Sequence, residues 1–284
     1  KNSNVLSPEY LFCLAPHLAS VVVRKAEGIG GRGVTRKFVS RMEIPLPPLK
    51  VQREIAAEIE CYQKVIDGAR VVIENYRPHI TIDPAWPVAD LGDVCSFASG
   101  GTPSKANDAY WSGQIPWVSA KDLKVDRIYD AGLHVSDEAI AESATQKVPI
   151  GSLLVLVRGM GLANGVPICE VMVPCAFNQD LKALLPKADM IHSRYLAFAL
   201  RQQDAYFRKV LETAAHGTLK LNSDALRRTK IPLPPLEIQE AIIAEIEAEQ
   251  ALVAANRHLI ARFETKIEQA IARVWGGAEE AAAA

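Results

Sequence analysis

The feature that most constrains this chain is an internal repeat. The hexapeptide Ile-Pro-Leu-Pro-Pro-Leu at residues 44–49 recurs unchanged at residues 231–236, and 15 of the 33 positions in 44–76 are identical in 231–263. Such a repeat has to be interpreted before any local motif, because each copy marks one structural unit. Proline is tolerated before or at the first turn of a helix but not inside it. The repeat therefore predicts two long helices, each beginning just after its prolines.

Both predicted helices carry apolar residues at a spacing of seven, which is typical of a coiled-coil seam. Glu249 and Asn256 interrupt the seam of the second helix. Helices of roughly 40–60 Å have too little core of their own, so we expect the two to pair with each other; packing of each helix on its own domain is the alternative. The residues expected to pair are Ile55, Ile59, Tyr62, Ile66, Ile73, Ile242, Ile246, Val253, Ile260, Phe263 and Ile267.

Several classes of protein are disfavoured by the composition. The formal net charge of −1 argues against a wholly basic nucleic-acid binder, although residues 24–43 hold six basic and two acidic side chains. No run approaches the roughly 18 apolar residues of a membrane span. The five cysteines form no CxxC pair, so we expect free thiols, no metal site and a cytoplasmic protein. The chain begins without methionine, and we expect it to be a fragment of a longer protein.

The region between the two helices predicts a β-rich domain, because its short apolar runs are broken by glycine and proline. Trp86, Trp111 and Trp117 are expected in its core. The turn at residues 159–165 is expected to follow a buried strand that ends at Arg158. The expected strands are 151–158, 166–173 and 181–185, and the expected shorter helices are 7–22, 137–144 and 193–211.

No catalytic motif is present in the sequence. It lacks GxxxxGK[ST], HExxH and GxSxG, and its two Asp-x-Lys tripeptides, at 122–124 and 180–182, have no upstream acidic partner. Lysine suits phosphate, arginine suits guanine, and asparagine or glutamine suits adenine. Glycine-rich basic loops at 27–37 and 215–223 favour phosphate contact over a plain surface turn. The candidate DNA-binding residues are Gly100, Thr102, Ser104, Lys105, Ser119, Lys121, Lys124, Arg158, Asn178, Gln179, His216, Thr218, Lys220 and Asn222.

These motifs, in this order, resemble the specificity subunit of type I restriction–modification systems. The resemblance covers residues 1–275 and includes the doubled proline-led helix start, LGDVCSFASGGTPS at 91–104 and FNQDLKALLP at 177–186. It implies a mixed α+β fold, with a β-rich target-recognition domain and two long helices that pair as an antiparallel coiled coil. It also implies a non-catalytic subunit that reads one half of a bipartite DNA site with each recognition domain, while the helices set the spacing.

The resemblance divides the chain into parts and implies its partners. The implied partners are two methyltransferase subunits and restriction (motor) subunits. S-adenosylmethionine, ATP and Mg²⁺ are expected in these partner subunits, and no cofactor is expected in this chain. The alternative from another class is a coiled-coil assembly protein whose globular domain binds protein. The implied parts are the end of a first recognition domain (1–43), a first spacer helix (44–77), a linker (78–85), a second recognition domain (86–230), a second spacer helix (231–275) and a disordered or non-native tail (276–284).

Overall fold

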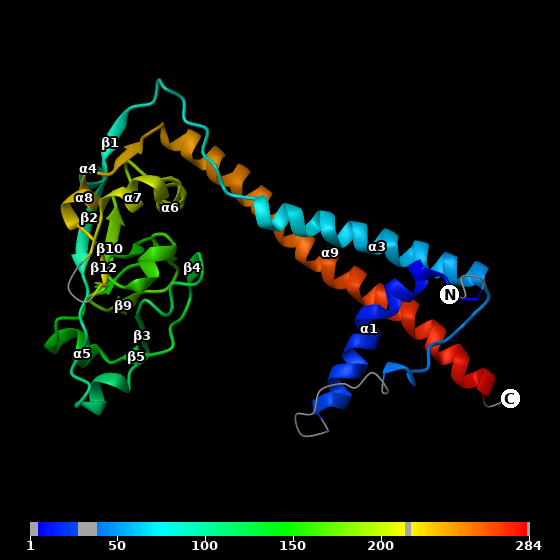
Figure 1. Cartoon of the computed structure of the whole chain (residues 1–284). Helices are drawn as coiled ribbons and strands as arrows, with labels where there is room; N and C mark the ends of the chain where they lie inside the picture. Colours follow the sequence, from blue (N-terminus) through cyan, green and yellow to red (C-terminus); the bar gives the residue numbers. More distant parts are fainter. Residues whose placement is uncertain (1–4, 28–38, 214–216, 283–284) are drawn as a thin grey trace. The chain divides into compact units, whose positions relative to one another are not determined.

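The computed structural model describes residues 5–27, 39–213 and 217–282. The chain divides into two compact units (Figure 1). We call residues 1–76 with 250–284 the helical unit and residues 77–249 the sheet unit. The long helix α9 (Leu236–Ala282) has residues in both units. The glycine-rich loop at 27–37 lies, except for Glu27, outside the described residues.

The helical unit is built from α1 (Pro8–Glu27), α3 (Leu49–Asn75) and the part of α9 after residue 249. α3 begins directly after Pro48, whose backbone is extended, and ends where the backbone becomes extended at Tyr76. Prolines thus mark the helix start, as the sequence predicts. The core of this unit consists of Tyr10, Leu14, Ala56, Ile59, Ala270, Ile271 and Val274.

Side chains of α3 and α9 meet within the helical unit. Arg70 Nη2 lies 3.0 Å from Glu264 Oε1, and Arg273 Nη2 lies 2.6 Å from Glu58 Oε2. The numbers rise on one helix as they fall on the other, so the two helices run antiparallel here. Of the predicted pairing residues, Ile59 and Ile66 are buried. The half-buried ones are Ile55, Tyr62, Ile73, Val253, Ile260, Phe263 and Ile267.

Two of the predicted pairing residues pack elsewhere. Ile246 is buried in the main core of the sheet unit, and Ile242 packs against the same core. The pairing role assigned to both is therefore corrected. The heptad pattern of the sequence continues through this part of α9, but here the apolar stripe packs against the main core of the sheet unit.

The sheet unit contains a five-stranded sheet in the order β2-β10-β7-β8-β4 and a four-stranded sheet in the order β5-β3-β9-β6. Neighbouring strands are antiparallel except for two parallel pairs, β3 with β9 and β4 with β8. The first sheet consists of β2 (Cys95–Ser99), β10 (Leu181–Pro186), β7 (Leu153–Leu156), β8 (Ile168–Val171) and β4 (Arg127–Ile128). The second consists of β5 (His134–Val135), β3 (Ile115–Val118), β9 (Cys175–Phe177) and β6 (Lys147–Val148).

Two short strand pairs and several helices complete this unit. The strand pairs are β1 (Val88–Asp90) with β13 (Lys230–Pro232) and β11 (Leu211–Thr213) with β12 (Leu219–Leu221). The helices are α4 (Leu91–Val94), α5 (Asp137–Glu142), α6 (Ser193–Gln202), α7 (Asp204–Val210), α8 (Ser223–Arg227), and the 3₁₀ turns η1 (Asp108–Trp111) and η2 (Met160–Asn164).

The five-stranded sheet is covered on both faces, which explains the unbroken apolar run of β7. Side chains of successive strand residues point to opposite faces. Leu153 and Val155 belong to the core shared with α6, whereas Leu154 and Leu156 belong to the core on the other face. Trp117 is buried, and Trp86 and Trp111 are half-buried against core residues, in agreement with the core role predicted for them.

Three expected boundaries differ in the structure. The helix expected at 193–211 is two helices, because the backbone turns at Gln203 and brings Phe207 back into the core. The part assigned to the second spacer helix, 231–275, starts within the strand β13, and the helix itself begins at Leu236, directly after the prolines, as the repeat predicts. The tail at 276–284, expected to be disordered or non-native, is helical to Ala282. Its residues after Gly277 are alanine and glutamate, which are strong helix formers.

The repeated segments adopt the same local structure in both units. In the sheet unit the Tyr195 hydroxyl donates to the Pro232 carbonyl oxygen at 2.9 Å. The amide of Gln239, which is fully buried, accepts from the backbone N–H of His192 and donates to the carbonyl oxygens of Met190 and Pro234. We call this arrangement the Tyr–Gln clamp. It fastens the start of α6 to the start of α9.

The helical unit contains a second Tyr–Gln clamp with matching partners. The Tyr10 hydroxyl donates to the Pro45 carbonyl oxygen at 3.1 Å. Gln52, again fully buried, accepts from the N–H of Ser7 and donates to the carbonyl oxygens of Val5 and Pro47. The duplication predicted from the sequence is therefore present in the hydrogen bonds as well as in the helices.

Candidate nucleic-acid interface

Two of the predicted loops meet at the ends of β2 and β9. The Gly101 N–H donates to the Phe177 carbonyl oxygen at 2.9 Å, and the Thr102 hydroxyl donates to Gln179 Oε1 at 2.7 Å. A Cβ atom on Gly100 would lie 2.3 Å from the Asn178 carbonyl oxygen, so only glycine allows this approach. Residues 100–105 and 178–180, far apart in the sequence, therefore form one surface.

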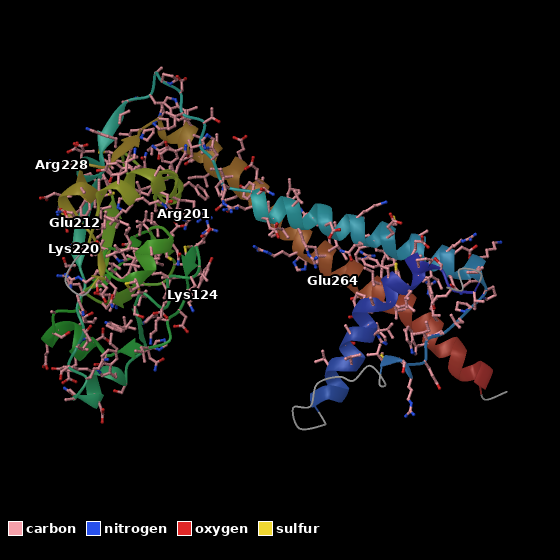
Figure 2. The ribbon with its side chains drawn as sticks, viewed as in Figure 1. Lys124, Arg201, Glu212, Lys220, Arg228 and Glu264 are labelled. Carbon is pink, nitrogen blue, oxygen red and sulfur yellow. The ribbon has the colours of Figure 1, made fainter. Side chains whose placement is uncertain are left out.

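Two further loops lie beside this surface. Arg158 forms an isolated antiparallel bridge with Lys220, and the Arg158 N–H donates to the Asp180 carbonyl oxygen at 3.2 Å. Arg158 is exposed, and Lys220 stands opposite Glu212 in the β11–β12 pair, as Figure 2 shows. We call residues 100–105, 157–159, 178–182 and 217–222 the loop cluster.

The structure adds one basic residue that was not among the candidate DNA-binding residues. Lys182 follows Leu181 in β10, and its ammonium group donates to the Ser99 hydroxyl at the end of β2, beside the loop cluster. The available signal was a lysine at the outward position of an otherwise apolar strand. Together with Arg158 and Lys220 it gives the loop cluster three cationic side chains, next to the carboxylates of Asp180 and Glu212.

Two of the predicted contact residues, Asn178 and Asn222, have structural roles. Asn178 is only 8% exposed, and its side-chain amide both donates to and accepts from Asp180. Asn222 caps α8 by accepting from the Asp224 N–H and donates to Glu212. Asn178 therefore stabilises the turn, and the base contact predicted for it stays a prediction. Gln179, its neighbour, is exposed.

The remaining candidates do not all lie in the loop cluster. The Ser119 hydroxyl and N–H both donate to Asp122 at 2.8 Å, which shapes the loop that carries Lys121 and Lys124. In Figure 2, Lys124 lies on the opposite side of the sheet unit from Lys220. Ser104 and Lys105 are exposed within the loop cluster and Thr218 is half-buried, whereas His216 is outside the described residues.

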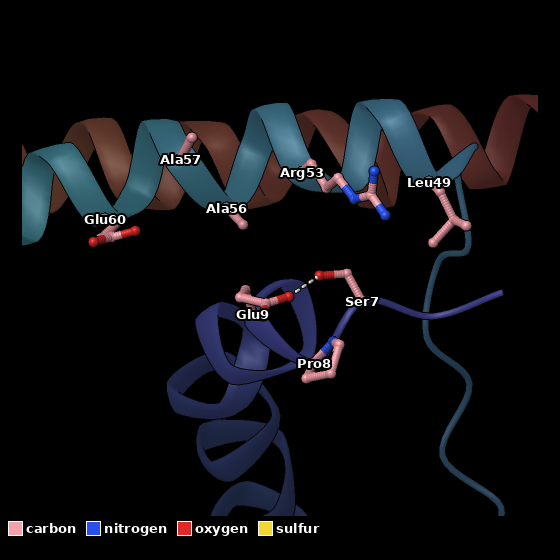
Figure 3. A pocket seen from close by; sticks show the side chains of 8 residues that line it. All are labelled: Ser7, Pro8, Glu9, Leu49, Arg53, Ala56, Ala57 and Glu60. Carbon is pink, nitrogen blue, oxygen red and sulfur yellow. Dashed lines mark hydrogen bonds between the residues drawn. The ribbon is translucent and has the colours of Figure 1, made fainter. Parts of the chain in front are cut away.

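A hollow of about 430 Å³ lies in the helical unit between the start of α1 and α3 (Figure 3). Glu9 accepts a hydrogen bond from the Ser7 hydroxyl, and this bond, aided by the charge of Arg53, lowers the pKa of the Glu9 carboxyl. The hollow is lined by Ser7, Pro8, Glu9, Leu49, Arg53, Ala56, Ala57 and Glu60.

The cysteines and acidic residues offer no metal or redox centre in the described part of the chain. All five cysteines are free thiols, as expected from their spacing. Burial raises the pKa of Cys95, Cys169 and Cys175 to about 12, so these thiols stay protonated at neutral pH. Among residues 5–27, 39–213 and 217–282, no cluster of His, Cys, Asp and Glu could hold a metal ion, and no helix is long and apolar enough to cross a membrane.

Comparison with known proteins gives consistent matches. Residues 85–264 match the family model described as the type I restriction modification DNA specificity domain. The chain is 28% identical over 191 residues to the EcoR124I/EcoR124II specificity subunit of Escherichia coli, covering 67% of this chain and 46% of that protein. It is 29% identical over 165 residues to the MjaIX specificity subunit of Methanocaldococcus jannaschii, covering 55% and 36%. The chain thus spans about half the length, or less, of these relatives.

Solved structures share the fold. The HsdS subunit from Thermoanaerobacter tengcongensis superposes with a TM-score of 0.55 at 22% identity, covering 96% of this chain and 71% of that one. A chain from a study of complex assembly and conformational transition of the type I R-M system superposes with a TM-score of 0.64 at 22% identity, covering 96% and 72%. The mixed α+β fold with its long C-terminal helix is confirmed by these neighbours.

Proposed function

The chain belongs to the family of type I restriction–modification DNA specificity domains, and from this premise we propose that it is a non-catalytic DNA-binding specificity subunit. In this proposal the sheet unit reads one half of a bipartite DNA site. The observation that supports it most directly is the loop cluster. Four loops from distant parts of the sequence bring Arg158, Lys182 and Lys220 beside the hydrogen-bonding side chains of Thr102 and Gln179.

The chemistry of the loop cluster fits DNA. Lysine ammonium groups neutralise phosphates and fix the register of a protein on the duplex. An exposed arginine such as Arg158 can form two hydrogen bonds with guanine in the major groove, and Gln179 can do the same with adenine. Asn178 holds the turn that presents Gln179. The carboxylates of Asp180 and Glu212 repel phosphates, so the phosphates of a bound duplex would lie beside the cationic side chains. The arrangement of these charges thus orients the duplex on the loop cluster.

We also propose a role for each part of the chain. Residues 86–230 act as a recognition domain, residues 44–77 and 231–275 as spacer helices, and residues 1–43 as the end of another recognition domain; residues 78–85 link the first helix to the domain, and residues 276–284 form a tail after the second. The antiparallel contacts between α3 and α9 support a coiled-coil spacer. We propose that this spacer sets the distance between two half-sites and docks methyltransferase subunits, with restriction subunits joining the complex; S-adenosylmethionine, ATP and Mg²⁺ would belong to those subunits.

Selection from a randomised duplex pool at low and high salt tests this proposal. We expect a short motif to be enriched at low salt, and replacement of Lys182 and Lys220 together by alanine should flatten the slope of log K against log salt by about 2. Arg158→Ala should relax the preference at one base pair, at a cost of about 1–3 kcal/mol. Lys64→Ala, which removes an exposed lysine of α3, is the matched control. Salt-independent binding, or no binding, would favour a protein-binding assembly module instead.

A further inference from the structure

Four side chains of alternating charge form a closed ring in the sheet unit. Arg127 contacts Glu170 at 3.2 Å, and Glu170 contacts Arg194 at 3.9 Å. Arg194 contacts Glu247 at 3.1 Å, and Glu247 contacts Arg127 at 2.5 Å. We call these four residues the charge ring. Each member has one neighbour of opposite charge on either side.

The charge ring connects four different elements. Arg127 lies in β4, Glu170 in β8, Arg194 in α6 and Glu247 in α9. It therefore joins the edge of the five-stranded sheet, the helix that covers the sheet, and the long helix. Two further contacts hold its inner part: the Ser193 hydroxyl donates to Glu170 at 2.7 Å, and the Arg194 guanidinium lies over the ring of Phe198.

Burial differs around the charge ring. The side chains of Glu170 and Arg194 are 8% and 9% exposed, whereas those of Arg127 and Glu247 are 34% and 38% exposed. Burying charge is costly, and apolar residues of similar size often give equal or greater stability. Hydrogen-bonded charges, however, tolerate few geometries, whereas an apolar contact tolerates sliding. Such a network therefore favours one arrangement of the elements more than it favours the folded state.

The other copy of the repeat shows what the same positions look like without the charge ring. The counterparts of Arg194 and Glu247 are Glu9 and Glu60, which have the same sign of charge and both line the hollow between α1 and α3 (Figure 3). No strand is present among the described residues of the helical unit that could supply partners like Arg127 and Glu170. Both copies contain the Tyr–Gln clamp. The clamp alone therefore does not supply ion pairs on this side of the long helix.

We propose that the charge ring fixes the orientation of the five-stranded sheet on residues 236–249 of α9, within the sheet unit, and thereby the position of the loop cluster relative to this part of the helix. Its members are positioning residues, because they lie outside the loop cluster. The consequence for DNA reading rests on the proposed function, but the orientation itself does not.

Distance measurements between two spin labels test the orientation directly. Glu138 in α5 and Ala248 in α9, both in the sheet unit, are exposed and can be replaced by cysteine for labelling. Cys13→Ala and Cys61→Ser remove the two more accessible thiols, while the three buried cysteines remain protonated and inaccessible. Pulsed electron–electron double resonance on the whole chain then reports the width of the distribution of distances between the two labels. The variants are Arg127→Met with Glu247→Met, Glu247→Gln alone, and Glu245→Gln as a control at an exposed position of the same helix.

The double methionine variant separates orientation from stability. We expect its melting temperature to stay within a few degrees of the parent while the distance distribution broadens. Glu247→Gln should broaden the distribution and lower the melting temperature by roughly 4–8 °C, and Glu245→Gln should change neither. If the double methionine variant does not fold, Glu247→Gln decides alone. A distribution as narrow as that of the parent in these folded variants would overturn the proposal.

A DNA measurement keeps the two proposals apart. The same variants are titrated with the duplex selected by the parent chain. Half-site affinity within about twofold of the parent, together with a broadened distribution, supports a positioning role, because the loop cluster itself is intact. A loss of affinity with an unchanged distribution would contradict it. Absence of DNA binding by the parent chain would contradict the proposed function, and the spin-label distances would then decide the role of the charge ring by themselves.

Discussion

Gly100 has no room for a side chain, and this limits how the loop cluster can vary. A Cβ atom there would lie 2.3 Å from the carbonyl oxygens of both Phe177 and Asn178, which are backbone atoms and cannot rotate away. We expect Gly100→Ala to destabilise the sheet unit by about 1–3 kcal/mol and to weaken DNA binding by displacing Thr102 from Gln179. Urea unfolding and duplex binding measure the two effects.

Gly68→Ala is the control for this substitution. Gly68 lies in α3 with nothing within 4 Å of the added Cβ, and alanine is favoured over glycine in a helix by about 1 kcal/mol. We therefore expect a small gain in stability and unchanged DNA binding. Equal stability of Gly100→Ala and the parent chain would show that the loops can separate without cost, and the loop cluster would then not be a fixed surface.

At the scale of single residues, the sequence predicts which side chains have the chemistry to contact DNA, but it does not predict which of them are exposed. Polar residues at 178–179 were recognisable as candidate base contacts, but their exposure depends on a turn that directs Asn178 inward and Gln179 outward. Lys182 was considered only as part of an Asp-x-Lys tripeptide and not as a DNA contact, because the sequence does not show that it lies beside Ser99. Both cases depend on which loops lie side by side, and that information is spread over strands far apart in the chain.

The helices show a similar division at the scale of elements. Seven-residue spacing predicted both long helices and their apolar stripe, since periodicity is a local property. The partner of each stretch is not local. From residue 250 the stripe faces the core that includes α1 and α3, whereas Ile246, one heptad before Val253, packs in the sheet unit. The change of partner occurs without a change of pattern, so sequence periodicity cannot locate it.

Phe263 provides the prediction for this element. Its ring lies 5.3 Å from that of Tyr62, and Lys266 lies over it. We expect Phe263→Asp to destabilise the helical unit by about 2–4 kcal/mol, because it loses apolar burial and places a charge in the seam. Hydrogen exchange should show faster exchange in α3 and in α9 after residue 250, with the sheet unit unchanged.

Leu252→Asp is the matched control, since Leu252 is 70% exposed on the same helix. An exposed substitution of this kind should change stability by no more than about 0.5 kcal/mol. If Phe263→Asp were as mild as Leu252→Asp, the contacts between α3 and α9 would be incidental, and the spacer proposed for these helices would need another basis.

At the scale of the whole molecule, the chain contains the Tyr–Gln clamp twice, once in each unit. Among the described residues, only the unit of the second clamp contains β-sheets. In each copy a tyrosine and a fully buried glutamine connect a short segment to the proline-led helix start. The sequence revealed the repeat, but it did not reveal the clamp, because four of the acceptors are backbone carbonyl oxygens of Val5, Pro47, Met190 and Pro234. Backbone acceptors are not encoded by residue identity.

The two glutamines allow the same substitution to be made once in each unit. Gln52→Leu and Gln239→Leu each leave one N–H and two carbonyl groups without their side-chain partner in a buried site, at a cost of about 2–4 kcal/mol. We expect Gln52→Leu to speed hydrogen exchange in α1 and the start of α3, and Gln239→Leu to do so in α6 and the start of α9. Gln63→Leu, at an exposed position of α3, should have little effect.

The pattern of exchange decides how the molecule is held together. If each variant speeds hydrogen exchange only in its own unit, the two Tyr–Gln clamps are independent. A mutation in one unit then leaves the other unit able to fold and function. If either variant speeds exchange in both units, α9 transmits stability between them, and the chain unfolds as one cooperative body. We expect the first outcome, because the described hydrogen bonds of each clamp all lie within a single unit.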